Sequence, residues 1–417
     1  KGLIVRNVEA TTNLAEIQKY IDKAKGAKVP LIISATYHSA WRLIDTNCHI
    51  NVMLGDEAHN LVMGRFSEDF KEETRNLQAD NKFFFTATPC NTPSDDGKGM
   101  NNQKYFGVEI YSKPYREMIE RNEILPIIIQ TVNVKSYILL KNKNAPATPD
   151  NMKDADFERD TTSKVLAIKD AFEYHTETLK GNSCSYEKIA PKLLATIDGV
   201  AVLKGILRSQ ETVNLYTSGI HVFAISSEIK YFHNGAYYEG YDFKEKFMQD
   251  IRSLKDTDKA IILHIDMIGE GLDVAGISAV MAFSTQGLQK LVQLLGRAMR
   301  LHEEDRKKLY EGKFIKGMDR IKTMIKPYAY MIVPMFLNES QDLYSYTRGI
   351  LKSIHAAYDW IPTVLYDQGR MIGDNENMNN QNFKGKHDVY DTLTFKNELE
   401  LDNLMRLMTS YTPQVTL

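Results

Sequence analysis

The sequence predicts an α/β protein with two parallel-sheet domains, followed by a mainly helical C-terminal extension. Two observations support this fold class. Over the first 125 residues, and again from Lys192 onward, short apolar runs alternate with stretches of helical character. The apolar runs are nearly continuous, which is typical of strands buried on both faces of a parallel sheet. Strands that alternate with helices favour parallel connections between the strands.

The first domain is expected to span residues 1–125. Its predicted elements, in chain order, are a helix over Asn13–Lys25, strands over Val29–Ser34 and Ile50–Leu54, a helix over Phe66–Gln78 and a strand over Lys82–Thr86.

The second domain is expected to span residues 126–338, and the run Ile127–Val134 leads into it. Residues 141–187 contain several Asn and Pro residues and few large apolar ones, which indicates a partly mobile insertion or linker with a helix near Ser163–His175. The α/β alternation then resumes. Its predicted elements are strands over Lys192–Ile197, His221–Ala224, Lys259–Asp266, Ser278–Phe283 and Tyr328–Pro334, and helices over Gly199–Ser209, Phe243–Arg252 and Leu288–Met299.

Residues 339–417 are expected to form a C-terminal extension, helical over Ser340–Tyr358 and then polar and irregular. The helix carries an apolar stripe, which is more typical of a core than of an interface. This extension is a candidate for docking a partner or another domain of a larger enzyme.

The composition is that of an ordinary globular protein, with 417 residues, 43% hydrophobic and 25% charged. Lys and Arg number 52 against 54 Asp and Glu. This balance argues against a protein that coats nucleic acid, but it allows a localised basic groove. Three scattered cysteines, no membrane-length apolar run and no signal peptide favour a cytoplasmic protein with no membrane partner. Because the first residue is Lys1 rather than Met, we expect the sequence to be an excerpt from a longer chain.

An acidic tetrapeptide, Asp56-Glu57-Ala58-His59, directly follows the apolar run Ile50–Gly55. A buried strand that ends in two adjacent carboxylates is how a nucleotide-hydrolysing site presents a Mg²⁺ ligand and a water-orienting acid. Alone, the tetrapeptide is also compatible with a strand end before a capped helix, because Asp and Glu favour that position.

Four further segments follow predicted strands or lie on a predicted helix. They are Thr36-Tyr37-His38-Ser39, Thr86-Ala87-Thr88-Pro89 and Gly269-Glu270-Gly271-Leu272-Asp273-Val274 after strands, and, on a helix, a fourth stretch, Gln293-Leu294-Leu295-Gly296-Arg297-Ala298-Met299-Arg300. Taken one at a time, each is compatible with an ordinary turn, loop or solvated helical face.

In this order and spacing, the four segments and the tetrapeptide resemble superfamily 2 helicases and translocases over roughly residues 30–335. The segments Thr36–Ser39 and Tyr115–Pro126, together with the strand Tyr328–Pro334, resemble more loosely the translocases of type I, type III and type ISP restriction enzymes. The resemblance implies two RecA-like domains, with ATP and Mg²⁺ in the cleft between them and nucleic acid across the top of both.

The resemblance also implies a role for each matching residue. Asp56 would hold Mg²⁺, Glu57 would polarise the attacking water, and His59 would couple this site to Thr86 and Thr88.

In the second domain, Arg297 and Arg300 would neutralise charge on the transferring phosphoryl group, and Gln293 would face the same cleft. The loop with Glu270, Gly271 and Asp273 would couple the nucleotide to the nucleic acid. Contact with the phosphates of the nucleic acid would be made by Thr36, Ser39 and Gly269.

The family's phosphate-cradling loop, Gly-x-x-x-x-Gly-Lys-Ser/Thr, does not occur in these 417 residues. Either the loop precedes Lys1 or the protein is a relative that has lost ATP binding. We expect the first, because the other catalytic positions are intact. The predicted function is therefore an ATP-dependent motor on nucleic acid, most simply duplex DNA, in a restriction or phage system. An RNA helicase and a non-hydrolysing nucleic-acid scaffold remain as alternatives.

Overall fold

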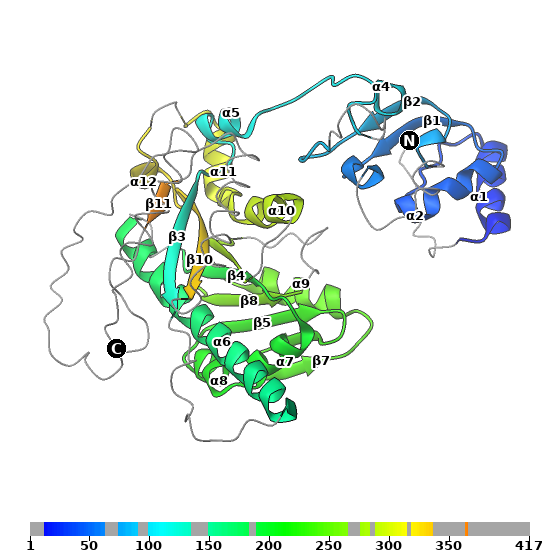
Figure 1. The fold of residues 1–417 in the computed structure, drawn as a ribbon. Helices are drawn as coiled ribbons and strands as arrows, with labels where there is room; N and C mark the ends of the chain where they lie inside the picture. The colour runs from blue at the N-terminus through cyan, green and yellow to red at the C-terminus, as the bar shows by residue number, and fades with distance from the viewer. Residues whose placement is uncertain are drawn as a thin grey trace, which may run out of the picture. The chain divides into compact units, whose positions relative to one another are not determined.

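The computed structural model divides the chain into two compact units, unit 1 (Lys1–Ser112) and unit 2 (Lys113–Leu417) (Figure 1). Each unit is described by itself. The structure describes residues 12–62, 74–90, 99–134, 149–182, 189–265, 276–283, 288–314, 318–336 and 363–365. Among these residues, no helix combines the length and apolar character that crossing a membrane requires.

Unit 1 contains a two-stranded parallel sheet in which β1 (Ile50–Gly55) pairs with β2 (Ala79–Phe84). Its helices are α1 (Leu14–Ala27), α2 (Tyr37–Ala40) and α4 (Gln103–Phe106), with 3-10 turns η1 (Trp41–Asp45) and η2 (Ala58–Leu61). Helix α1 begins where the Asn13 side chain accepts the Ala15 N–H at 2.9 Å. It ends at Lys28, which has a left-handed backbone.

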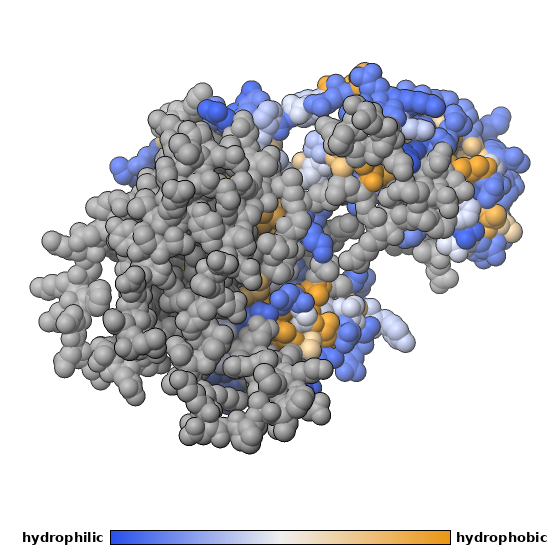
Figure 2. Space-filling model, viewed as in Figure 1, coloured by the Kyte–Doolittle hydropathy of each residue, from blue (hydrophilic) through white to orange (hydrophobic). Residues whose placement is uncertain are grey.

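The predicted strand over Val29–Ser34 is wrong, because residues 29–36 have no strand structure. A strand requires a neighbour for its backbone N–H and C=O groups. Within the described part of unit 1, β1 and β2 pair only with each other. Apolar side chains from this segment consequently reach the surface, and Ile32 is 75% exposed. Figure 2 shows apolar residues among the hydrophilic ones on the visible surface of the described residues. The helix predicted over Phe66–Gln78 lies largely outside the described residues.

Unit 2 begins at Lys113, earlier than the domain boundary at residue 125 that the sequence suggested. The physical reason is burial. Ile119 on α5 (Tyr115–Glu120) and Leu125 both lie within the hydrophobic core of unit 2. Residues 113–125 therefore belong structurally to the second unit.

The sheet of unit 2 has the strand order β11-β3-β10-β9-β4-β8-β5-β6-β7 in the described part of the chain. The strands are β3 (Ile127–Val134), β4 (Lys192–Thr196), β5 (His221–Ser226), β6 (Lys230–His233), β7 (Ala236–Tyr238), β8 (Ala260–His264), β9 (Ala279–Ala282), β10 (Ala329–Phe336) and β11 (Thr363–Leu365). The pairs from β11 to β5 are parallel, and β6 and β7 are added antiparallel.

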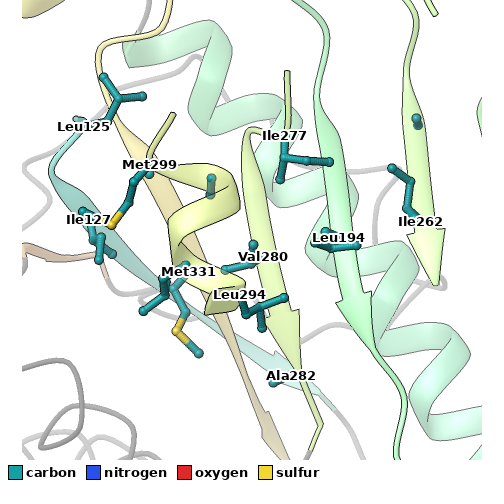
Figure 3. Close-up of a cluster of buried hydrophobic side chains, with 14 of the residues drawn as sticks. Leu125, Ile127, Leu194, Ile262, Ile277, Val280, Ala282, Leu294, Met299 and Met331 are labelled. Carbon is teal, nitrogen blue, oxygen red and sulfur yellow. The ribbon is translucent and has the colours of Figure 1, made fainter. Parts of the chain in front are cut away.

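Helices cover both faces of this sheet, and successive strand residues alternate between two cores. Leu194 lies in the core under α9 (Phe243–Ser253) and α10 (Leu288–Ala298), part of which Figure 3 shows. The neighbouring Leu193 lies in the core under α6 (Pro149–Asn182), α7 (Val200–Arg208) and α8 (Gln210–Thr217). Two short helices, α11 (Glu303–Tyr310) and α12 (Arg320–Thr323), precede β10.

The region 141–187 contains the helix that was predicted near Ser163–His175, as part of a longer helix that packs in the core. Helix α6 is 34 residues long. It buries an apolar stripe that includes Val165, Ile168 and Phe172. It also packs closely on α7, because a Cβ on Gly205 would lie 2.7 Å from the Thr161 Cγ2 atom. The polar start of the segment obscured this stripe in the sequence.

The hairpin β6–β7 and the helices α8, α11 and α12 were not predicted. The hairpin has a local signal that could have revealed it. Asn234 and Gly235 both have positive φ, 46° and 90°, as the Asn-Gly hairpin turn requires. Helix α5 and strand β11 were not predicted either, and β11 joins the sheet of unit 2 although residues 339–417 were expected to form a separate extension. The strands β3, β4, β5, β8, β9 and β10 and the helices α7, α9 and α10 confirm the sequence-based elements to within a few residues. The helix predicted over Ser340–Tyr358 lies outside the described residues.

Candidate functional site

The two adjacent carboxylates lie at the carboxyl end of the sheet in unit 1. Two backbone hydrogen bonds extend the pairing of β1 and β2 beyond the strands: Phe85 donates to the Gly55 carbonyl at 2.8 Å, and Ala58 donates to the Phe85 carbonyl at 2.9 Å. Between these bonds, the Asp56 side chain accepts the Glu57 N–H at 3.0 Å, and Glu57 has a left-handed backbone with φ 48°. This tight turn presents an exposed Asp56 next to a partly exposed Glu57.

Tyr37, which the sequence analysis did not select, supports the same turn from α2. Its hydroxyl donates to the Asp56 carbonyl at 2.6 Å. Burial and the charges of Asp56 and Glu57 raise the pKa of Tyr37 to about 12, so its hydroxyl remains a donor at neutral pH. Gly55 permits this approach, since a Cβ there would lie 3.0 Å from the Tyr37 hydroxyl and 2.8 Å from the Phe84 ring. The only sequence signal was the position of Tyr37 between two residues expected to contact phosphates.

His59 connects the acidic pair to the residues after β2. Its side chain is buried, and its Nδ1 lies 2.8 Å from Thr86 Oγ1, 3.4 Å from Thr88 Oγ1 and 3.3 Å from Glu57 Oε2. The Thr88 N–H also donates to Thr86 Oγ1 at 3.1 Å. The structure thus brings three predicted residues, Glu57, Thr86 and Thr88, around Nδ1 of a fourth, His59. A small rotation of the imidazole ring can exchange the partner of this nitrogen.

Thr36 and Ser39 lie at the start of α2, on the same short segment as Tyr37. Their hydroxyl oxygens are 3.1 Å apart, and the Ser39 hydroxyl also donates to the Thr36 carbonyl at 3.3 Å. Both side chains therefore lie on the segment that supports the acidic turn.

In unit 2, α10 buries one side and leaves the other partly exposed. The buried side comprises Leu291, Val292, Leu294, Leu295 and Ala298. The partly exposed residues are Gln293, Gly296, Arg297 and, just past the helix end, Arg300. Their spacing places them on one helical face. Burial and the charge of Arg306 lower the pKa of Arg300.

Gly296 lies on this partly exposed face. A Cβ at this position would meet no atom within 4 Å. Glycine within a helix costs about 1 kcal/mol of stability relative to alanine.

The predicted coupling and nucleic-acid residues Gly269, Glu270, Gly271 and Asp273 lie outside the described residues. The strand that precedes them, β8, ends at His264, whose Nε2 lies 2.9 Å from Thr196 Oγ1 at the end of β4. The segment therefore starts from the carboxyl edge of the parallel sheet.

A Mg²⁺ ion fits Asp56 by the chemistry of its donor atoms. Mg²⁺ is commonly held by one or two carboxylates together with waters and substrate phosphates. Asp56 offers an exposed carboxylate, of which only Oδ1 accepts the Glu57 N–H. The described residues contain no group of three or more His, Cys, Asp or Glu side chains that could hold a metal by themselves. Asp56 fits an ion that is shared with a nucleotide.

Residues 201–302 match the family model of the helicase conserved C-terminal domain. This part of the chain is therefore similar to helicase C-terminal domains. The matched helicase domain runs from α7 past α10 and so includes Gln293, Arg297 and Arg300. No curated protein matches the chain.

Solved structures show the fold of the helicase-like chain. One is the ATP-dependent type ISP restriction-modification enzyme LlaBIII bound to DNA, at 15% identity and a TM-score of 0.53, covering 84% of this chain and 23% of that one. A fragment of an HsdR subunit of a type I restriction enzyme from Vibrio vulnificus has 15% identity and a TM-score of 0.42, covering 76% and 48%. S. cerevisiae Dbp5 bound to RNA has 11% identity and a TM-score of 0.35, covering 76% and 68%. The chain therefore spans less than a quarter of the length of the type ISP enzyme, and the first likeness shows an α/β fold with RecA-like parallel-sheet domains.

Proposed function

We propose that this chain is the motor part of an ATP-dependent DNA translocase or helicase. The observation that carries the proposal is the acidic turn after β1, in which His59 links Glu57 to Thr86. Such a turn can place a metal ligand and a water-orienting acid side by side, while a buried imidazole transmits their state to the next strand. The helicase C-terminal domain in unit 2 supports the same proposal with the face of α10 that carries Arg297.

The reaction is hydrolysis of the bond between the γ-phosphorus and the bridging oxygen of ATP. A Mg²⁺ ion held by Asp56 would offset the charge of the phosphates. Glu57 would orient the attacking water, and Asp56 would hold the ion. Arg297 and Arg300 would neutralise charge that develops on the transferring group, with Gln293 beside them.

Movement on nucleic acid would follow from the coupling residues. Thr86 and Thr88 would exchange hydrogen-bond partners between nucleotide states, and Glu270, Gly271 and Asp273 would pass the change to the bound strand. Thr36, Ser39 and Gly269 would hold strand phosphates without reading bases. Duplex DNA is the proposed track because the sequence resembles restriction-enzyme translocases and because the type ISP enzyme of similar fold is described as bound to DNA.

The test is steady-state ATP hydrolysis by the protein as encoded in full, without nucleic acid and then with duplex DNA, single-stranded DNA or RNA. Stimulation by duplex DNA is expected. Stimulation by RNA alone would move the assignment to an RNA helicase, and no hydrolysis under any condition would favour a nucleic-acid-binding scaffold.

Two variants assign the catalytic roles. Glu57→Gln should abolish hydrolysis while ATP binding stays measurable, and the exposed Glu109→Gln on the same unit should change neither. Arg297→Ala should slow hydrolysis without altering the unfolding of unit 2, with the exposed helical Arg208→Ala as its control. Hydrolysis retained by Glu57→Gln would contradict the role assigned to Glu57.

A further inference from the structure

The end of α10 is held by donors from outside the helix. The last carbonyls of a helix have no donor within it. Here the carbonyl of Ala298, the last residue of α10, and those of Met299 and Arg300, which follow the helix, accept from donors elsewhere in unit 2. The Lys326 ammonium donates to the Ala298 carbonyl at 2.6 Å and to the Arg300 carbonyl at 3.1 Å. Between them, the Leu125 N–H donates to the Met299 carbonyl at 2.9 Å. The main chain that carries Arg300 is therefore fixed by distant parts of unit 2.

Lys326 is itself buried and firmly placed. It is 4% exposed, and its ammonium also donates to the Ile277 carbonyl just before β9. Its three N–H groups thus meet three carbonyls. The fully buried Asp305 on α11 accepts the N–H groups of Ile325 and Lys326, each at 3.0 Å, and so fixes the loop from which Lys326 extends.

We propose that Lys326 is a positioning residue for the arginine pair, holding the end of α10 so that Arg297 and Arg300 keep the direction that ATP hydrolysis needs. This inference rests on the proposed function. Arg300 lies beyond the last helical residue, so the regular helix does not set its direction. Its direction is set instead by the main chain at Ala298 and Arg300, and the Lys326 ammonium donates to the carbonyls of both residues. Because small misplacements of catalytic groups reduce rates strongly, a residue that fixes this main chain affects turnover without touching substrate.

Lys326 changes its protonation state near neutral pH. Burial, followed by the charge of Lys192 on β4 and also that of Arg300, lowers its pKa to about 7, while Asp305 acts in the opposite direction. The other titratable group that interacts with it is His175 on α6. Below pH 7 the ammonium has three N–H donors for three carbonyls. Above pH 7 the amine has two donors and a lone pair, so one carbonyl loses its partner and the helix end loosens.

The test uses the protein as encoded in full and the variant Lys326→Met, which keeps an apolar stem of similar length. We expect kcat for ATP to fall about tenfold, with KM within about twofold, because the arginines act on the transition state. Amide hydrogen exchange over residues 295–301 should become about tenfold faster. The control is Lys164→Met, which removes another buried lysine of unit 2, paired with Asp198 at 2.9 Å, and should leave both quantities unchanged.

A pH profile tests the same contact without disturbing the core. The wild-type kcat should fall as pH rises through about 7, the pKa of Lys326. Lys192→Met removes a charge that lowers this pKa and should move the falling limb to higher pH. A wild-type kcat that stays constant from pH 6.5 to 9 would overturn the proposal. So would a pH profile of kcat that is the same in wild type and in Lys192→Met. Both outcomes can be measured even if Lys326→Met fails to fold.

The outcomes separate this proposal from the function on which it rests. A wild-type protein without ATP hydrolysis contradicts the proposed function. An active wild type with an equally active, equally exchanging Lys326→Met variant contradicts only the role of Lys326.

Discussion

The two units hold their candidate site residues in different ways. In unit 2, every residue of β4, β8 and β9 is buried, and α10 lies on a continuous core. In unit 1, β1 has one buried residue, Gly55, and Leu54 is 67% exposed. The acidic turn of unit 1 is held instead by the Tyr37 hydroxyl, which donates to the Asp56 carbonyl, and by the contact between His59 Nδ1 and Thr86 Oγ1. The comparison teaches that a packed core holds α10, with the polar contacts of Lys326 at its end, whereas in unit 1 local polar contacts alone hold the carboxylates.

The largest expected difference comes from matched truncations of one leucine in each sheet. Leu194→Ala should lower the free energy of unfolding of unit 2 by about 2–5 kcal/mol, because the cavity lies between buried strands. Leu54→Ala should change the free energy of unfolding of unit 1 by no more than about 0.5 kcal/mol. Denaturant-dependent hydrogen exchange, resolved for each unit, measures both. A large loss of stability in Leu54→Ala would contradict the comparison, because it would mean that the face of β1 that carries Leu54 is covered.

Acid should destabilise unit 2 through a buried histidine. His175 contacts Gln130 Oε1 at 3.0 Å and Ser278 Oγ at 2.8 Å, and burial, then the charge of Lys326, lowers its pKa from 6.5 to about 3. Its contribution is complete above pH 6.5 and is lost as pH falls toward 3, because only the unfolded chain takes up the proton. The loss should reach about 3 kcal/mol at pH 4.5, at about 1.4 kcal/mol per pH unit.

The matching measurement is denaturant unfolding of wild type and His175→Gln at pH 7.0 and 4.5. The variant should lack this part of the acid sensitivity, and an identical pH dependence in both proteins would show that His175 does not cause it.

A smaller effect should follow in unit 1 from Thr86→Val. The variant removes the closest partner of the buried His59 Nδ1 atom. It should lower the free energy of unfolding of unit 1 by about 1–2 kcal/mol. Thr88→Val should cost less, because its hydroxyl is 3.4 Å from the same nitrogen. Hydrogen exchange in unit 1 gives the measurement. Equal losses from the two variants would contradict the hydrogen-bond order in this turn.

The smallest expected effects are stabilising and come from one helical glycine in each unit. Gly26→Ala on α1 and Gly296→Ala on α10 should each raise stability by about 0.4–1 kcal/mol, because a Cβ at either position meets no atom within 4 Å. Only Gly296→Ala should also slow ATP hydrolysis, since its face carries Arg297. Thermal unfolding together with turnover distinguishes the two. Unchanged turnover in Gly296→Ala would show that nothing approaches this face closely.

Much of the fold could be predicted because its signals are local. The strand β1 and the acidic pair after it follow from an apolar run that stops at two carboxylates. Helix α10 follows from its 3.6-residue periodicity, which also places Gln293, Arg297 and Arg300 on one face. These features depend on residues a few positions apart, so the sequence by itself determined them.

Only the tertiary structure decided what those local elements meet. Val29–Ser34 has the composition of a strand and no partner strand in the described part of unit 1, and α6 has a polar start and a buried core stripe. The contacts of Lys326 with Ile277, of His175 with Ser278 and of Tyr37 with Asp56 join residues far apart in the chain. The free energy of a buried polar group depends on the partner that satisfies it, and that partner is chosen by packing over long sequence separations rather than by the neighbouring residues.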